Sequence, residues 1–352
     1  MARKGISHFF KRKPMDGRPE IHQIVPGTAL PGGEVVIRGS GFTAGNHCRP
    51  RVEVGGVEAP VVIGADDFII ARIPEGAGSG AVTVSSTQGS SPPFELEVGV
   101  GIADNLHPVT NPALDAEGNI YATFSGALGQ KVPVSLYKID LHYHSFPFVA
   151  EIMNASGLAF DRGGQLYVSS RHEGTVYRVA PNGSASPYAE GMGIATGLAF
   201  DAHGNLYVGD RSGTVFKIGP DRQIFVFATL EPSISAYHLA FGPDRYLYVT
   251  GPTTSSYDAV YRVSTAGDAE VFYRGLGRPQ GLAFDVEGNL YLAASLGGRK
   301  GIVRITPEGK AELVISGTGL VGLAFAAGPA IVVASTNAVF RVNWVTKGLP
   351  LL

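Results

Sequence analysis

The chain has 352 residues, which is enough for two domains or one large repeat fold. Its formal net charge is −2 and charged residues make up only 16% of it, so the composition gives no reason to expect a nucleic acid or an anionic membrane as partner. The single cysteine, Cys48, excludes a disulfide within the chain, while 48 Gly and 23 Pro favour many short strands joined by turns.

The first 19 residues are basic and contain no apolar run long enough for a secretory signal. We expect a disordered basic arm in this region, and therefore a cytoplasmic protein, with export as an open alternative. The competing interpretation is an anchor to an acidic partner or membrane surface. Its residues would be Arg3, Lys4, Phe9, Phe10, Lys11, Arg12 and Lys13.

Residues 20–96 contain alternating strand patterns broken by Gly and Pro about every ten residues, which predicts a small β-sandwich. The segments "IVPGTALPGGEVVIRGSGF", "VEVGGVEAPV" and "ARIPEGAGSGAVTVSS" resemble an IPT/TIG domain, which has an immunoglobulin-like fold. Some members of that family bind DNA through basic loops. Here the sequence offers only Arg38, Arg49, Arg51 and Arg72, so we expect a spacer or packing role instead.

Residues 97–346 contain six similar units with a period of 40–46 residues. Each unit reads as four antiparallel strands, typified by "GLAFDAHGNLYVGD" and the alternating strand that follows it, and this pattern predicts a six-bladed β-propeller. The last unit lacks a fourth strand, so we expect residues 97–103 to supply it and close the ring. Residues 347–352 remain as a tail.

Two features of the repeats have competing interpretations. The D-x-x-G-N segments suit tight turns better than calcium loops, because they lack the ligand density that calcium needs. The charge-free stretch between Glu312 and Arg341 is long enough for a membrane span, but its glycines and its register in the repeat predict buried strands.

The repeat resembles NHL-type six-bladed propellers and, more loosely, gluconolactonase-like and strictosidine-synthase-like propellers. The resemblance is specific for the fold and weak for the function. It implies a ligand face built from the starts of the inner strands and the loops between the second and third strands. Residues aligned just before the inner strands are Thr110, Ser156, Thr196, Tyr237, Gln280 and Val321, and neighbouring candidates on this face are Asn111, Arg171, His172, Asp210, Arg211, His238, Arg299 and Lys300.

This mixed and mildly basic face suits an anionic or hydroxylated small ligand, or a peptide segment, although solvated loop residues would look the same. Gluconolactonase-like enzymes hold a divalent cation with oxygen ligands, and the ring offers no carboxylate. If calcium or zinc binds, the expected ligands are Asp104, Asn105, Asn111 and Asn154. The pair His142 and His144 reads as a surface pair, because no third ligand is near in the sequence.

The sequence therefore predicts a monomeric, two-domain, all-β protein without catalytic residues or cofactor. We expect a non-catalytic binding or scaffold protein that holds a small polar molecule or a protein partner on the propeller. The alternative is a metal-dependent lactonase or related hydrolase with one divalent cation. A third class, a cell-surface adhesive module, would require export.

Overall fold

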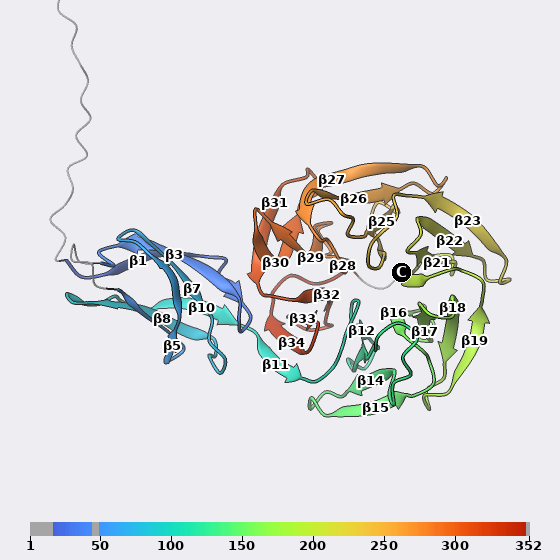
Figure 1. Cartoon of the computed structure of the whole chain (residues 1–352), viewed down its shortest axis with the longest axis horizontal. Helices are drawn as coiled ribbons and strands as arrows, with labels where there is room; N and C mark the ends of the chain where they lie inside the picture. The colour runs from blue at the N-terminus through green and yellow to red at the C-terminus, as the bar shows by residue number, and fades with distance from the viewer. Residues whose placement is uncertain (1–16, 44–48, 350–352) are drawn as a thin grey trace, which may run out of the picture.

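A computed structural model of the protein describes residues 17–43 and 49–349. The seven residues named above as a possible anchor, Cys48 and residues 350–352 lie outside this part of the chain. The described residues form strands and turns in two units, a small sandwich and a ring of four-stranded sheets (Figure 1). None of them forms a helix long and apolar enough to cross a membrane.

The N-terminal unit is a sandwich of two sheets. One sheet has the order β1-β3-β7-β6, and the other has the order β2-β10-β8-β4-β5 with β9 beside β8. The bounds are β1 (Glu20–Val25), β2 (Thr28–Ala29), β3 (Glu34–Ser40), β4 (Arg51–Val54), β5 (Val57–Ala59), β6 (Val61–Gly64), β7 (Phe68–Arg72), β8 (Gly80–Ser86), β9 (Gly89–Ser90) and β10 (Phe94–Val98).

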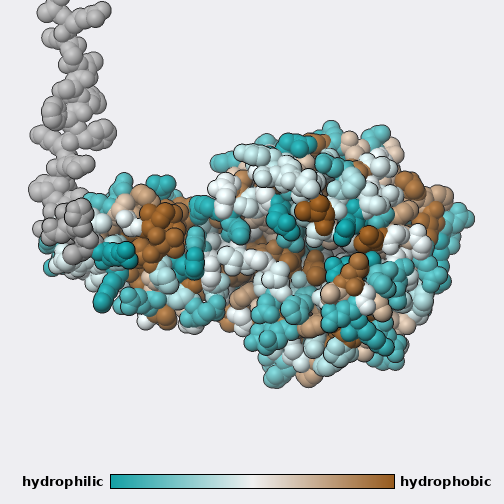
Figure 2. Space-filling view, in the orientation of Figure 1, coloured by the Kyte–Doolittle hydropathy of each residue, from teal (hydrophilic) through white to brown (hydrophobic). Residues whose placement is uncertain are grey.

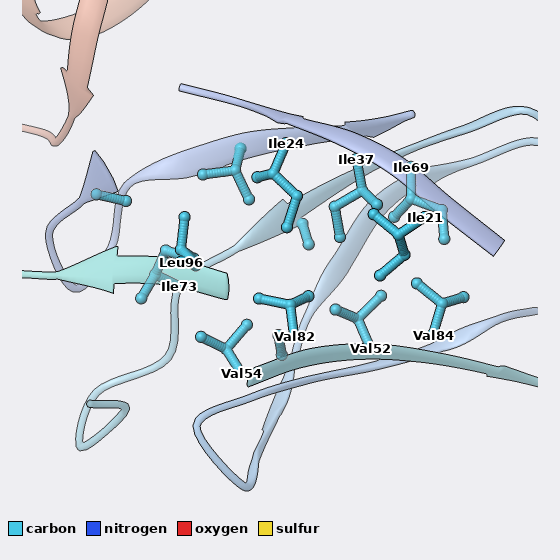
Figure 3. Packing of buried hydrophobic residues seen from close by; sticks show 14 of the residues in the cluster. Ile21, Ile24, Ile37, Val52, Val54, Ile69, Ile73, Val82, Val84 and Leu96 are labelled. Atoms are coloured by element: carbon cyan, nitrogen blue, oxygen red, sulfur yellow. The ribbon is translucent and has the colours of Figure 1, made fainter. Parts of the chain in front are cut away.

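Alternation along the strands builds the sandwich core. In β3, Val35 and Ile37 are fully buried whereas Arg38 is exposed, as expected for a strand with one face on the core. Figure 3 shows β-branched side chains from both sheets meeting between them, including Ile37 and Ile69 of one sheet and Val84 of the other.

The propeller has six four-stranded blades around a central channel (Figure 1). In blades one to five the inner strand comes first in the chain, whereas in blade six the outermost strand comes first and the inner strand second. Blade one contains β12 (Ala113–Leu114), β13 (Ile120–Thr123), β14 (Leu136–Ile139) and β15 (Ser145–Val149). Blade two contains β16 (Ala155–Phe160), β17 (Leu166–Ser170), β18 (Thr175–Val179) and β19 (Ala185–Ala189). Blade three contains β20 (Ala195–Phe200), β21 (Leu206–Asp210), β22 (Thr214–Ile218) and β23 (Ile224–Thr229).

The remaining blades continue the ring. Blade four contains β24 (His238–Phe241), β25 (Leu247–Thr250), β26 (Asp258–Val263) and β27 (Ala269–Gly277). Blade five contains β28 (Leu282–Phe284), β29 (Leu290–Leu296), β30 (Arg299–Ile305) and β31 (Ala311–Ser316). Blade six contains β32 (Leu320–Phe325), β33 (Ala330–Ser335), β34 (Val339–Asn343) and β11 (Val100–Ala103). We call the end of the channel where the inner strands begin its upper end, and the opposite end its lower end.

The ring is closed by an early segment of the chain. β11 pairs antiparallel with β34, so a strand that precedes blade one completes blade six. The segment 97–103, considered above as one propeller strand, is divided in the structure: Glu97 and Val98 belong to β10 of the sandwich. The charge-free stretch forms the buried strands β32 and β33 together with the ends of β31 and β34.

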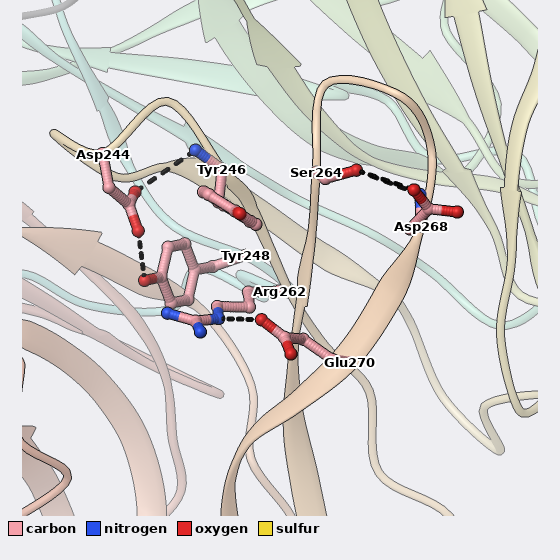
Figure 4. Close-up of polar contacts among 7 residues, drawn as sticks. All are labelled: Asp244, Tyr246, Tyr248, Arg262, Ser264, Asp268 and Glu270. Carbon is pink, nitrogen blue, oxygen red and sulfur yellow. Dashed lines mark hydrogen bonds and ion pairs between the residues drawn. The ribbon is translucent and has the colours of Figure 1, made fainter.

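The turns at the lower end are held by an aspartate carboxylate, including the turn of blade four, which reads "GPDR" where other blades have the D-x-x-G motif. In blade four, Asp244 accepts a hydrogen bond from the backbone N–H of Tyr246 at 3.2 Å and from the hydroxyl of Tyr248 at 2.8 Å (Figure 4). Burial raises the pKa of Tyr248, so its hydroxyl stays a donor. On the outer strands of the same blade, Arg262 pairs with Glu270 at 2.6 Å. The turns therefore use their carboxylates for structure.

The sandwich and blade five share one continuous sheet. β2 lies between β10 of the sandwich and β31 of blade five and pairs parallel with both. The N–H of Leu30 donates to the carbonyl of Ser316 at 2.8 Å, and the N–H of Glu34 donates to the Ser316 hydroxyl, also at 2.8 Å. Arg299 donates to the carbonyl of Val25 at 2.7 Å. Arg299 thus belongs to the domain junction, where its guanidinium donates to Val25. The prediction that Arg299 rims the channel is therefore wrong.

The outer strand of blade three exposes an apolar patch. Ile224, Phe225 and Val226 of β23 are 39%, 54% and 66% exposed, and Figure 2 shows apolar residues at this part of the rim. Fourth strands are the edges of the blades, so exposed side chains are expected there. The described residues contain nothing that covers this patch.

Candidate functional site

The six residues predicted to precede the inner strands lie inside the propeller, at contacts between blades. Three of them, Ser156, Thr196 and Val321, are already part of β16, β20 and β32. Thr196 shows the pattern: its hydroxyl donates to the carbonyl of Gly209 at 2.9 Å and accepts from the N–H of Tyr237 at 3.0 Å. Thr110, Ser156, Thr196, Tyr237 and Val321 are buried, and Gln280 is half-buried. These positions therefore join blades, and Gln280 also lines a pocket.

Tyr237 was expected on the ligand face, but its ring packs between blades three and four. A Cβ added to Gly251 would lie 2.5 Å from the ring, and one added to Gly209 would lie 2.7 Å from the tyrosine Cβ, so both glycines make room for it. The Tyr237 hydroxyl donates to the carbonyl of Glu231. With its ring buried and its hydroxyl paired, Tyr237 stabilises the fold and is not available to a ligand.

Two side chains fill the middle of the channel. In blades two, three, five and six a glycine lies near the start of the inner strand, and the residues at the aligned positions of blades one and four are Asn111 and His238. The four glycines are Gly157, Gly197, Gly281 and Gly322. The Asn111 amide donates to the carbonyl of Leu282 at 2.8 Å and accepts from the N–H of Leu323 at 3.1 Å. The Thr110 hydroxyl lies 3.3 Å from Nδ1 of His238, which joins blades one and four. This layer separates the upper channel from the lower channel.

His238 is a buried titratable group within this layer. It is 2% exposed, and its Nε2 has no hydrogen-bond partner among the described residues. Burial lowers the pKa of His238 to about 4, because the charged imidazolium would lose its hydration. The imidazole is therefore neutral at physiological pH, and it acts as a hydrogen-bonding filler of the channel.

This burial predicts a specific acid sensitivity. The pKa of His238 in the folded protein lies below its ordinary value of about 6.5, so protonation favours the unfolded chain. The stability contributed by the neutral imidazole is therefore fully present above pH 6.5 and is lost as the pH falls toward 4. Because of His238, we expect the free energy of unfolding to be about 2 kcal/mol lower at pH 5 than at pH 7. Denaturation of the protein and of a His238→Gln variant at both pH values checks this. An equal pH dependence in both proteins would contradict it.

Arg171 and Arg211 lie close together on the upper face, together with His172 and Asp210. Arg171 donates to the carbonyl of Gly126 at 2.9 Å, and burial followed by the nearby Arg211 lowers the pKa of its guanidinium. His172 lies against Gly129 of the blade-one loop. The Asp210 carboxylate accepts from the N–H of Ile194 at 2.9 Å and from the Ser212 hydroxyl, so it does not pair with either arginine. This part of the face is cationic, but Arg171 also supports a loop.

The four residues considered as metal ligands occupy separate hydrogen-bond sets. Asn154 is fully buried; its amide accepts from the N–H of Gly129 at 2.7 Å and donates to the carbonyls of Gly126 and Ala127 at 3.0 and 2.9 Å. Asn111 bonds blades five and six, as described above, whereas Asn105 donates to Asp104 at 3.1 Å. Residues 17–43 and 49–349 contain no group of three His, Cys, Asp or Glu side chains placed to hold a metal ion.

The histidine pair lies on the hairpin between β14 and β15. The rings of His142 and His144 are 6.2 Å apart, and Nδ1 of His144 lies 3.3 Å from the carboxylate of Asp140. Both backbone N–H groups also donate to Asp140 at 2.8 Å, and these bonds, that of His144 first, lower the pKa of its carboxyl. Asp140 thus caps a surface turn.

A pocket on the upper face lies over blades four and five and the start of blade six, and the sequence predicts only part of its lining. Its volume is ≈ 810 Å³. We call it the upper cleft. Its polar lining residues are Thr253, Thr254, Ser255, Ser256, Tyr257, Arg278, Gln280, Ser295 and Lys300.

A buried carboxylate holds two walls of the upper cleft together. Asp258 accepts from the N–H and hydroxyl of Thr253 at 3.0 and 2.6 Å and from the N–H of Arg278 at 3.2 Å. Asp258 is 2% exposed, so it positions the walls without lining the pocket. The loop "GPTTSSYD" was the signal in the sequence, because it places five hydroxyl-bearing residues in a row.

The charge of the upper cleft is positive. Among the described residues, the charged ones that line it are Arg278 and Lys300, and both are exposed. Neither forms an ion pair with an acidic residue in the described part of the chain. Two free cations beside hydroxyl and amide groups can bind an anionic group and orient a hydroxylated one. The glycines Gly297 and Gly298 leave open space beside them.

Comparisons with known proteins agree with this architecture. Residues 19–97 match the family model of the IPT/TIG domain. No curated protein sequence matches the chain. The fold is similar to an auxiliary nutrient binding protein from Bacteroides thetaiotaomicron, with a TM-score of 0.55, 11% identity, and 93% of this chain and 98% of that chain covered.

Two enzymes share the fold as well. A gluconolactonase from Xanthomonas campestris has a TM-score of 0.55 and 15% identity over 69% of this chain and 88% of its own. The virginiamycin B lyase from Staphylococcus aureus has a TM-score of 0.50 and 12% identity over 94% of this chain and 97% of its own. Such identities establish the fold alone, which is an immunoglobulin-like IPT/TIG domain followed by a six-bladed propeller.

Proposed function

We propose that this protein, an IPT/TIG domain joined to a six-bladed propeller, is a non-catalytic binding protein that holds a small, anionic, hydroxylated ligand in the upper cleft. The observation that carries the proposal is the lining of the cleft, in which Arg278 and Lys300 have no acidic partner among the described residues and no carboxylate lines the pocket. A sugar acid or a sugar phosphate has the matching chemistry, because it combines a negative charge with several hydroxyl groups.

The neighbouring side chains support a ligand of this kind. Tyr257 is 69% exposed at the rim, where its ring offers an apolar face to a sugar ring. Thr254, Ser256 and Ser295 add hydroxyl groups, and these hydroxyls form no hydrogen bond with other described residues. A nutrient binding protein and a lyase share the fold over most of the chain, so the proposal rests on the lining of the cleft.

Calorimetric titration with a panel of sugar acids, sugar phosphates and the matching neutral sugars tests the proposal. The protein should bind an anionic member, and an Arg278→Met, Lys300→Met double variant should bind it about 10- to 100-fold more weakly, because a hydrogen bond to a charged group contributes about 1.5–3 kcal/mol. The control is an Arg162→Met, Lys310→Met double variant, whose side chains are exposed and do not line the cleft.

The lactonase alternative is tested on the same samples. Measurement of metal content by elemental mass spectrometry, together with a lactone hydrolysis assay, distinguishes binding from metal-dependent catalysis. One divalent ion per chain with hydrolysis would contradict the proposal. Equal affinity for anionic and neutral sugars, or unchanged binding by the Arg278 and Lys300 double variant, would contradict the assigned site.

A further inference from the structure

The lower half of the central channel is a second pocket, separate from the upper cleft. It has a volume of ≈ 500 Å³ and is lined by residues of all six inner strands. Each inner strand places an alanine on this lining, and leucine and phenylalanine neighbours complete the wall. The six alanines are Ala113, Ala159, Ala199, Ala240, Ala283 and Ala324.

The upper end of this pocket is blocked. Asn111 lines it and bonds to blades five and six, and His238 lies two residues before Ala240 on β24, hence on the same side of the strand. The Asn111 and His238 side chains therefore lie at the upper end of this pocket, and the exposed Lys347 lines its lower mouth. Water within apolar walls has few hydrogen-bond partners, so displacing it with an apolar group is favourable.

The chain already places one aliphatic side chain at the lower mouth. The N–H of Leu349 donates to the carbonyl of Phe284 at 2.8 Å, and the carbonyl of Lys347 accepts from the N–H of Val286 at 3.0 Å. Gly348 forms a β-bridge with Asp285 between these two bonds. The half-buried Leu349 packs on the cluster that contains Leu282 and Phe284. The mouth thus accommodates aliphatic groups beside the tail.

Within residues 17–43 and 49–349, two charged residues line this pocket, and their environments differ. Asp115 accepts from the N–H and side-chain amide of Asn119 at 2.8 and 2.7 Å and from the Tyr121 hydroxyl at 3.0 Å, and Lys138 lies 3.8 Å away. Lys347 is exposed and has no ion pair with an acidic side chain in the described part of the chain. The positive charge at the mouth is therefore the one available to a ligand.

We propose that the lower channel binds a linear aliphatic carboxylate, with the alkyl chain against the alanine ring and the carboxylate beside Lys347. This site is independent of the upper cleft, since the Asn111 and His238 layer lies between them. The ligand is held by burial of its chain and by one charge-assisted contact at the mouth.

A series of straight-chain carboxylates of increasing length, titrated into the full chain by calorimetry, tests the site. Affinity should rise about fourfold for each added methylene until the channel is filled. An Ala283→Phe variant narrows the channel and should lose the gain with length. An Ala159→Leu variant on another blade repeats the test if the phenylalanine prevents folding, which the melting temperature reports.

The head group is tested with matched alcohols. A Lys347→Met variant should bind the carboxylates about tenfold more weakly and the alcohols of equal length unchanged, while Lys310→Met should bind both as the unmodified protein does. The Arg278→Met, Lys300→Met variant should bind the carboxylates in the lower channel with unchanged affinity. The lower-channel proposal can therefore be judged even if the upper cleft binds no ligand. Affinity independent of chain length, unchanged binding in both channel variants, or equal loss of alcohol and carboxylate in Lys347→Met would overturn the proposal.

Discussion

Replacing Leu30 by alanine is expected to lower the free energy of unfolding by about 2–5 kcal/mol, the cost of removing a buried leucine side chain. Leu30 follows β2 of the sandwich, but its side chain is 1% exposed within the core of blades five and six, beside Ile302 and Ile315. A Cβ added to Gly99 would lie 2.3 Å from it, which indicates how closely the chain packs there. The substitution therefore leaves a cavity at the domain junction.

The same contact predicts that the two domains of the unmodified protein unfold together. β2 pairs with strands of both domains, so neither domain can open without breaking that sheet. Fluorescence of Trp344, the single tryptophan, reports on blade six, and far-ultraviolet circular dichroism reports on all strands. The two denaturation curves should coincide for the unmodified protein and separate for Leu30→Ala.

A surface substitution provides the comparison for Leu30. Ile63 lies on β6 at the edge of the sandwich and is 47% exposed, so Ile63→Ala should change the free energy of unfolding by about 0.5 kcal/mol or less. If the two probes already give separate transitions in the unmodified protein, the junction does not couple the domains. A small effect of Leu30→Ala on both probes would lead to the same conclusion.

The repeated parts of this fold could be predicted from the sequence, because each repeat carries its own local signals. The "GLAFD" and "GNLYV" segments combine alternating apolar residues with an aspartate that bonds its own turn, as Asp201 does at 2.9 Å to the N–H of His203. Those interactions lie within a few residues, so their pattern is visible along the chain. The period then predicts the blades.

The domain junction could not be predicted in the same way. β2 is only two residues long, and its pairing with β31 joins residues 287 positions apart, as in Ala29 with Ser316. A strand of this length has no periodic pattern. Its partner is selected by the packing of Leu30 and the hydroxyl of Ser316, which exist only when both domains are folded.

The candidate site was predicted only in part, because its residues come from loops that differ between blades. The sequence predicts Gln280 and Lys300 as site residues, but it does not predict Arg278 or the hydroxyl-bearing residues of the blade-four loop. Tyr237 was placed on the ligand face from its position before β24. Its side chain turns away because Gly209 and Gly251 leave space between blades, and that space depends on the neighbouring strands.

Replacing Gly281 by alanine is the second change with a large expected effect. Gly281 directly precedes the inner strand of blade five, where a Cβ would lie 2.0 Å from Oδ1 of Asn111, 2.6 Å from Cα of Gly322 and 2.7 Å from the carbonyl of Val321. Two of these three atoms belong to the backbone of blade six, so they cannot move without opening the ring. We expect a loss of about 3 kcal/mol in the free energy of unfolding, at the upper end of the usual cost of overpacking.

Gly328 is the matched control for this substitution, because a Cβ there would meet nothing within 4 Å and its backbone is not in the left-handed region. Gly328→Ala should leave the free energy of unfolding within about 1 kcal/mol of the unmodified value.

An Asn111→Ala, Gly281→Ala double variant removes one of the three close contacts and leaves the two backbone contacts. A double-mutant cycle measured by chemical denaturation should therefore show a coupling of about 0.5–3 kcal/mol with incomplete recovery of stability. Full recovery of the free energy of unfolding would show that the steric clash involves the Asn111 side chain alone. An absence of coupling would show that the channel layer does not contact Gly281.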